Sequence, residues 1–272
     1  MKKLLGAFLI VALTAFAGRF FFSPDSQKPA PVPAAEIMTQ EATLTVATYN
    51  IHHGADQTGA LRLREIGTLL QDADIVFLSE VDRRYSTRSG FADQLLLLKE
   101  YTGLSYHAYA PTLQRAGFLN LGGSYGIAVL SRYPITNAQV IYLPTSAFAE
   151  PRAALVVEVN WNGRTVRVLG THLAVQENDR NQQLAALARL QLDLDLVLGD
   201  LNAAPKSIAS LADHFQLTLA NNQPTFPAEN PSVQIDYIFY SSRFDLLSVH
   251  TSSYLYSDHL PVIAKLKPNY LN

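Results

Sequence analysis

The sequence contains no cysteine, and neither sign of charge dominates it. Without cysteine the chain can form no disulfide, no thiolate zinc site and no cysteine nucleophile, so any metal must be bound by oxygen or imidazole ligands. Its 272 residues include 21 Lys+Arg and 23 Asp+Glu, for a net charge of −2, and only 16% of the residues are charged. This balance excludes a strongly basic nucleic-acid scaffold and a charge-driven disordered protein.

Glycine and proline are also few, at 14 each, whereas 48% of the residues are hydrophobic. A chain of this length and hydrophobicity can bury a large core, in one domain or in two. There is no internal repeat and no second linker after Thr43. We therefore expect one domain over residues 42–272.

The N-terminal residues are typical of a signal peptide or a membrane anchor. Two lysines precede an uncharged apolar run over residues 4–18, and Ala17 ends a small-x-small cleavage site. Three phenylalanines follow, so an uncleaved anchor remains an alternative. We assign residues 1–22 to this signal or anchor and residues 23–41, with four prolines, to a semi-extended linker. Either alternative predicts an exported (periplasmic or extracellular) protein or a membrane-anchored domain outside the cytoplasm.

Alternating and continuous apolar runs predict a strand-rich fold after residue 42. We expect strands over residues 44–48, 74–79, 126–131, 138–143, 153–161, 164–169, 194–198, 235–240, 248–254 and 261–266. Asn162-Gly163 predicts a hairpin between two of these strands. The spacing of leucine and isoleucine predicts helices near residues 63–70 and 184–190. Many strands with few helices indicate two packed sheets with helices outside them.

Polar side chains recur where the predicted strands end. They are Asn50, Glu80, His172, Asp200, Asn202, Asp258 and His259. In layered α/β proteins the loops beyond strand ends converge, so we expect these side chains to form one site. Carboxylate and amide oxygens favour Mg²⁺ or Mn²⁺ over zinc. Asp236, within a predicted strand, could accept an imidazole N–H and fix its tautomer. Carboxylates, a metal and an Asp–His pair together indicate phosphoester hydrolysis.

Six motifs, in order, resemble the endonuclease/exonuclease/phosphatase superfamily, which includes DNase I-like nucleases, abasic-site endonucleases, neutral sphingomyelinases and inositol-polyphosphate 5-phosphatases. The motifs are Ala47-Thr48-Tyr49-Asn50-Ile51, residues 74–81 ending Ser79-Glu80-Val81, Thr171-His172-Leu173, Gly199-Asp200-Leu201-Asn202-Ala203, Ile235-Asp236-Tyr237-Ile238 and Ser257-Asp258-His259-Leu260-Pro261-Val262. They span almost all of residues 43–267. The resemblance implies a four-layer α/β/β/α sandwich, with two mixed β-sheets packed face to face and helices outside.

The resemblance also implies a role for each site residue. The metal ligands would be Asn50, Glu80 and Asp258, with Mg²⁺ or Mn²⁺ as cofactor. The catalytic residues would be His172, Asp200, Asn202, Asp236 and His259. Asp200 would orient or deprotonate water, Asn202 would hold the phosphoryl group, and Asp236 would orient His259. In two further loops, Tyr125 and Arg152 are candidates for binding the substrate anion, although a core tyrosine and a surface arginine are the alternatives.

The substrate remains open at this stage. Removal of residues 1–17 would leave a mildly acidic chain without a lysine-rich stripe, which disfavours a nuclease without excluding it. We expect a lipid or inositol-type phosphoester, or a nucleic acid cleaved by a secreted DNase I-like endonuclease. The motifs do not separate a diesterase from a monoesterase. A non-catalytic binding module on the same fold is the alternative from another class, and we expect a monomer.

Overall fold

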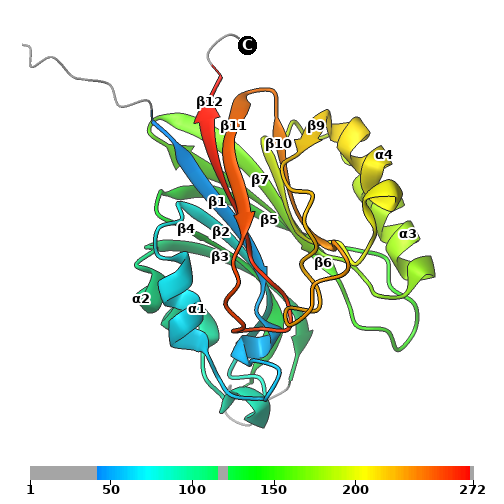
Figure 1. Ribbon diagram of the computed structural model, residues 1–272. Coiled ribbons are helices and arrows are strands. Elements are labelled where there is room, and N and C mark those ends of the chain that lie inside the picture. Colours follow the sequence, from blue (N-terminus) through cyan, green and yellow to red (C-terminus); the bar gives the residue numbers. More distant parts are fainter. Residues whose placement is uncertain (1–41, 116–121, 270–272) are drawn as a thin grey trace, which may run out of the picture. The chain divides into compact units, whose positions relative to one another are not determined.

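Two six-stranded β-sheets pack face to face in the computed structural model, which describes residues 42–115 and 122–269 (Figure 1). The first sheet contains β1 (Leu44–Asn50), β2 (Ile75–Arg83), β3 (Tyr106–Gln114), β4 (Ser124–Ser131), β11 (Phe244–Thr251) and β12 (Val262–Pro268), in the order β11-β12-β1-β2-β4-β3. The second contains β5 (Ile135–Tyr142), β6 (Ala153–Trp161), β7 (Arg164–His172), β8 (Leu196–Asp200), β9 (Leu217–Leu219) and β10 (Asp236–Ser241), in the order β5-β6-β7-β8-β10-β9. The pairs β1–β2 and β7–β8 are parallel and the others antiparallel, so both sheets are mixed.

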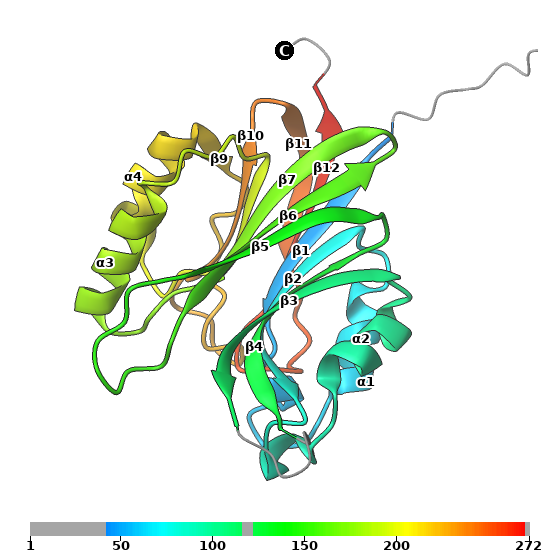
Figure 2. The ribbon, with the colours of Figure 1, turned by 180° about the vertical axis from the view of Figure 1, so that it is seen from behind.

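Helices cover the outer faces of both sheets (Figure 2). The first sheet carries α1 (Leu63–Leu70) and α2 (Gln94–Thr102), and the second carries α3 (Glu177–Leu187) and α4 (Pro205–Phe215). Two short 3₁₀ helices, η1 (His52–Gly54) and η2 (Thr87–Ser89), lie in loops. The predicted four-layer α/β/β/α sandwich is therefore confirmed.

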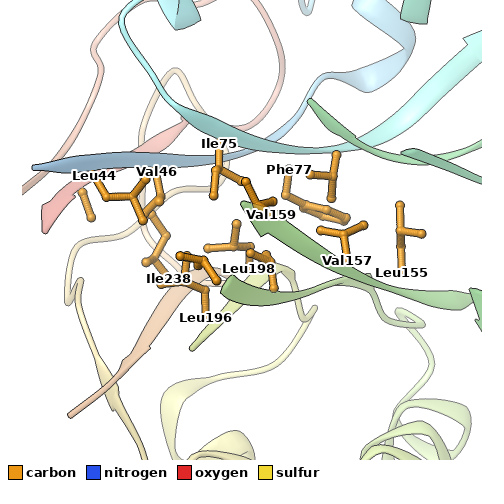
Figure 3. Close-up of a cluster of buried hydrophobic side chains, with 14 of the residues drawn as sticks. Leu44, Val46, Ile75, Phe77, Leu155, Val157, Val159, Leu196, Leu198 and Ile238 are labelled. Atoms are coloured by element: carbon orange, nitrogen blue, oxygen red, sulfur yellow. The ribbon is translucent and has the colours of Figure 1, made fainter. Parts of the chain in front are cut away.

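Three clusters of buried apolar side chains separate the four layers. The central cluster fills the space between the sheets and includes Val46, Phe77, Val157 and Leu198 (Figure 3). A second cluster packs the second sheet against α3 and α4, and a third packs the first sheet against α1 and α2. Successive residues of β2 alternate between the central and the third cluster, which explains its continuous apolar sequence.

Most predicted elements are confirmed, including the Asn162-Gly163 hairpin between β6 and β7. The strand predicted over residues 248–254 is wrong for its last three residues, because the chain leaves the sheet after Thr251 to reach the ends of β1 and β8. The second predicted helix ends at Leu187, so Leu190 lies beyond it in a turn. The elements α2, β3, α4 and β9 were not predicted.

One edge of the sandwich, which we call the site edge, lies where β1, β2, β7 and β8 all end. The two sheets meet there, since Asn50 at the end of β1 contacts Asp200 at the end of β8. The described loops at this edge comprise residues 51–62, 84–93, 143–152, 173–176, 201–204, 220–235 and 252–261. The polar residues singled out from the sequence lie on these loops and strand ends.

The described part of the domain falls in one compact unit. The predicted signal or anchor over residues 1–22 and the linker over residues 23–41 lie outside the described residues, so these boundaries stay predictions. Within the described ranges, no helix is both long and apolar enough to cross a bilayer.

The close approach of the two sheets requires glycine at position 170. A Cβ atom there would lie 2.2 Å from Cδ2 of Phe77 in the opposite sheet. We expect Gly170→Ala to lower the free energy of unfolding by about 1–3 kcal/mol, because the added methyl group overpacks the central cluster. Urea denaturation measures this. Thr165→Ala, an exposed position on the same strand, is the matched control with an expected change below about 0.5 kcal/mol. Equal stability of the two variants would contradict this packing.

Candidate active site

Three neighbouring strands of the second sheet place three polar side chains in one row at the site edge. Asp200 at the end of β8 is in register with His172 on β7 and with Asp236 on β10. All three are buried. His172 Nε2 lies 3.4 Å from Asp200 Oδ2, so its N–H faces the carboxylate. The parallel β7–β8 pair and the antiparallel β8–β10 pair thus build the centre of the site.

His259 connects the two aspartates of this row. Its Nδ1 lies 2.8 Å from Asp236 Oδ2, and its Nε2 lies 3.7 Å from Asp200 Oδ2. The ring of Phe226 packs against the imidazole at 4.8 Å between centroids. Burial opposes protonation, but the negative charges of Asp236 and Asp200 outweigh it and raise the pKa of His259. The arrangement favours an imidazolium with both N–H groups directed at carboxylates.

Asn50 joins the two sheets at the seam. Its Nδ2 donates to Glu80 Oε1 at 3.2 Å and to Asp200 Oδ2 at 3.1 Å, and its Oδ1 accepts from the backbone N–H of His52. Glu80 lies within an irregularity of the β2–β4 pairing, between Leu78 and Val81, and has a φ of 62°, a conformation uncommon for a residue with a side chain. This bulge turns the Glu80 carboxylate toward Asn50, and positive φ values of this kind concentrate at functional sites.

The segment 257–259 is attached to the end of β1. Ser257 Oγ donates to the backbone carbonyl of Asn50 at 2.8 Å, and the carbonyl of Asp258 accepts from Ala228 N at 2.7 Å. The Asp258 carboxylate is partly exposed, and its Oδ1 lies 3.9 Å from His52 Nδ1. These bonds hold Asp258 beside the site and place the next residue, His259, within it.

Arg152 is buried at the site rather than on the surface. Its Nη1 donates to His172 Nδ1 at 2.8 Å and lies 3.0 Å from Glu150 Oε1. Because Nδ1 accepts this bond, the neutral His172 carries its proton on Nε2 and directs it at Asp200. Burial, together with the charge of Arg152, lowers the pKa of His172 well below its usual value. The surroundings of Asp200 therefore favour the neutral form of His172 and the protonated form of His259.

Asn202 and Tyr125 complete the predicted set. The Asn202 backbone N–H donates to Asp200 Oδ1 at 2.9 Å, and its side-chain Nδ2 donates to the Leu173 carbonyl. Tyr125 is buried, and burial together with the charges of Glu80 and Glu150 raises its pKa above the usual range. All ten residues predicted from the sequence thus lie at the site edge, linked by these contacts and charge interactions.

The site holds more negative charge than its own cations balance. Burial and the charge of Asp236 raise the pKa of Asp200, and burial and the charge of Asp258 raise that of Glu80. Among the described atoms, the buried Asp236 Oδ1 has no hydrogen-bond partner. The raised pKa values of Asp200 and Glu80 mean that a nearby cation would stabilise both carboxylates in their ionised form. Hard oxygen donors in a cation-deficient site suit a divalent metal such as Mg²⁺ or Mn²⁺.

Two sets of residues could hold such a cation. Asp200, Asp236 and His259 offer ligand atoms within 4.8 Å of one another. In this set, however, Asp236 Oδ2 and His259 Nδ1 are already bonded to each other. The set predicted from the sequence, Asn50, Glu80 and Asp258, lies beside Asp200 on the first sheet and its loops. Both sets are oxygen-rich, and the donors fit a hard cation in either case.

Sequence reasoning missed or undervalued several groups that the structure brings to the site. Glu150 pairs with Arg152, Ser257 holds Asn50, and the Phe226 ring covers His259. His52, on the loop after β1, approaches Asp258. Ser257 is part of the sixth quoted motif and Glu150 lies two residues before Arg152, but nothing in the sequence placed Phe226 near His259.

The sequence profile of the endonuclease/exonuclease/phosphatase family matches residues 47–259. The chain therefore belongs to this family, whose members are hydrolases of phosphoesters and generally depend on a divalent metal.

Similar proteins include the uncharacterized protein YbhP of Escherichia coli (strain K12), 29% identical over 253 residues that cover 84% of this chain and 98% of that protein. A crystal structure of an endonuclease/exonuclease/phosphatase from Beutenbergia cavernae is similar with a TM-score of 0.70 and 24% identity, covering 84% of this chain and 72% of that one. Sphingomyelinase C from Streptomyces griseocarneus has a TM-score of 0.57 and 20% identity over 82% of this chain and 99% of that one. At these identities the two structures show the fold alone.

The Asp236–His259 contact generates a pH prediction. In the wild type the pKa of His259 is raised, so its imidazolium persists as the pH rises through the ordinary range. Asp236→Asn removes the adjacent charge and should lower the pKa of His259 by at least about one unit, so that its proton is lost at lower pH. NMR titration of the His259 ring measures this. Asp213→Asn, an exposed position on α4, should leave the titration unchanged, and an unchanged titration in Asp236→Asn would contradict the pairing.

Proposed function

We propose that this protein is a Mg²⁺- or Mn²⁺-dependent phosphoesterase that hydrolyses a phosphodiester, or a phosphomonoester, by attack of water. One observation carries the proposal: two histidines with different protonation preferences flank the buried carboxylate of Asp200 at the seam of the two sheets. A carboxylate beside two imidazoles can accept a proton and bind phosphoryl oxygens in the same site. A non-catalytic binding module would have no need of this pairing.

We assign Asn50, Glu80 and Asp258 to hold the metal. When bound, a divalent cation supplies charge neutralisation on the phosphoryl oxygens. Burial and the negative charge of Asp258 raise the pKa of Glu80, which supports this assignment because a bound cation would stabilise the ionised carboxylate. Asn50 would orient the Glu80 and Asp200 carboxylates relative to each other, since its amide contacts both.

The remaining residues would bind the phosphoryl group and move a proton. Asp200 would orient water and accept its proton at Oδ2, the oxygen that faces both histidines. His172 and His259 would donate from Nε2 to phosphoryl oxygens, with Arg152 fixing the tautomer of His172 and Asp236 orienting the His259 imidazolium. We assign Asn202 to hold the phosphoryl group. The Tyr125 hydroxyl and the Arg152 guanidinium would donate further hydrogen bonds to the substrate anion.

We further propose a cellular location and a substrate class for the reaction. The apolar N-terminal run and the proline-rich segment support an exported or membrane-anchored protein that acts outside the cytoplasm or at a membrane surface. The substrate would be a lipid or inositol-type phosphoester, or a nucleic acid. The fold is compatible with the lipid class, since a sphingomyelinase shares it. We propose that the chain acts as a monomer.

The proposed proton transfer predicts large losses of rate. Asp200→Asn or His259→Ala should lower turnover of a soluble artificial phosphodiester by about 10²–10⁴-fold, because each removes a group that acts on water or phosphate. Asp213→Asn and His250→Ala change the same residue types at exposed positions and should stay within about twofold of the wild type. Circular dichroism would check that all four variants fold. Wild-type turnover in folded Asp200→Asn and His259→Ala would refute the mechanism.

The metal assignment predicts a change in stability on cation binding. Adding Mg²⁺ or Mn²⁺ should raise the melting temperature of the wild type, since the cation binds only the folded site. Glu80→Gln should weaken that response, whereas Glu100→Gln, exposed on α2, should preserve it. The response should also fade as the pH falls, because burial raises the pKa of Glu80 and protons then compete with the cation. An equal cation response in both variants would exclude Glu80 as a ligand.

A further inference from the structure

Large apolar side chains are exposed on six loops of the site edge and on none of the described loops at the opposite edge. They are Leu61, Phe91, Phe148, Val175, Val233, Tyr254 and Leu255. The described loops at the opposite edge expose polar residues instead, such as Gln71, Arg132 and Asp193. The other exposed large hydrophobic residues of the described chain lie on α2 or on strands. The asymmetry therefore belongs to the edge that contains the active site.

Phe148 is the most prominent member of this set. Its side chain is fully exposed, and its backbone has a φ of 67°, which is rare for a bulky residue. It lies in the loop 143–152, two residues before Glu150, which pairs with Arg152. Phe91 has a φ of 55° and is also exposed, on the loop before α2. Both the backbone conformation and the hydration of the exposed ring surface cost free energy.

The distribution of these side chains fits a lipid surface better than a folded partner. They lie on six separate loops around the site, with Tyr254 and Leu255 as neighbours on one of them, whereas a protein interface buries a contiguous packed patch. A fluid interface accepts individual apolar side chains wherever they project. Exposed Arg84 and Arg115, on segments near the same edge, suit the phosphates of lipid headgroups.

We propose that the site edge docks onto a lipid–water interface through these seven side chains, so that the substrate is a phosphoester presented at a lipid surface. This inference rests on the proposed phosphoesterase function and narrows it to one substrate class. Docking in this orientation brings Asp200, His172 and His259 to the level of the lipid phosphates.

The length of chain before β1 is compatible with this orientation. β1 begins at the opposite edge and runs toward the site edge, a distance of roughly 20–25 Å for its length. A segment as long as residues 23–41 can span up to about 60 Å when extended. An apolar segment at residues 1–22 and the site edge could therefore engage the same membrane.

The test introduces a fluorescent reporter at single positions of the full chain. Phe148→Trp places an indole at the site edge, and Leu247→Trp places one on β11, away from that edge, as the matched control. The native Trp161 is buried between the sheets and gives a constant background. Both variants carry the same N-terminal segment, so membrane binding through that segment affects them equally.

Vesicles of phosphatidylcholine and phosphatidylglycerol are then added, with or without brominated acyl chains. We expect F148W emission to shift to shorter wavelength and to be quenched by the brominated lipids, while L247W emission stays unchanged. No response in F148W, or an equal response in both variants, would overturn the docking. A response of F148W to duplex DNA and not to vesicles would also overturn it, in favour of a nucleic-acid surface.

Turnover of a soluble artificial phosphodiester by the wild type separates this inference from the proposed function. Metal-dependent turnover without the F148W response would overturn the docking alone. The F148W response without turnover would support the docking and overturn the phosphoesterase proposal on which the substrate class rests.

Discussion

The structure depends on burying the carboxylate of Asp200 at the seam where two sheets meet. A buried carboxylate is stable only with hydrogen bonds and positive charge around it. Asn50 supplies an N–H from the first sheet, the Asn202 backbone supplies another, and the two imidazoles supply the rest. Each partner comes from a different strand end or loop. The hydrogen bonds that stabilise the Asp200 carboxylate therefore both join the two sheets and build the polar site.

The two histidines beside the buried Asp200 carboxylate have opposite protonation preferences. Arg152 and burial keep His172 neutral with its proton on Nε2, whereas Asp236 and Asp200 favour the imidazolium of His259. Identical side chains on either side of one carboxylate thus offer different protonation states. The excess negative charge left over, on Glu80 and Asp258, is the physical basis for expecting a divalent cation.

Much of this could be predicted from the sequence, because the informative residues follow strands that the apolar pattern reveals. Asp200 and His172 end such strands, and parallel pairing brings such ends together. The burial of Arg152 could not be predicted, since it depends on contacts with His172 and Glu150 from other elements. The helix α2 was missed because its four consecutive leucines hide the helical period, although Leu95 and Leu98 are buried and Leu96 is exposed. The strand β3 was missed because it lies at a sheet edge, is half-exposed and contains Pro111.

The most direct test of the account is the position of Mn²⁺ in crystals of the wild-type protein, located by anomalous diffraction. The account predicts a peak bound directly by a Glu80 carboxylate oxygen, with the His259–Asp236 contact intact. Such a peak would establish the first sheet as the source of the metal ligands. A peak bound by Asp236 and His259, with Glu80 remote from it, would contradict the account, because His259 could then no longer serve the phosphate.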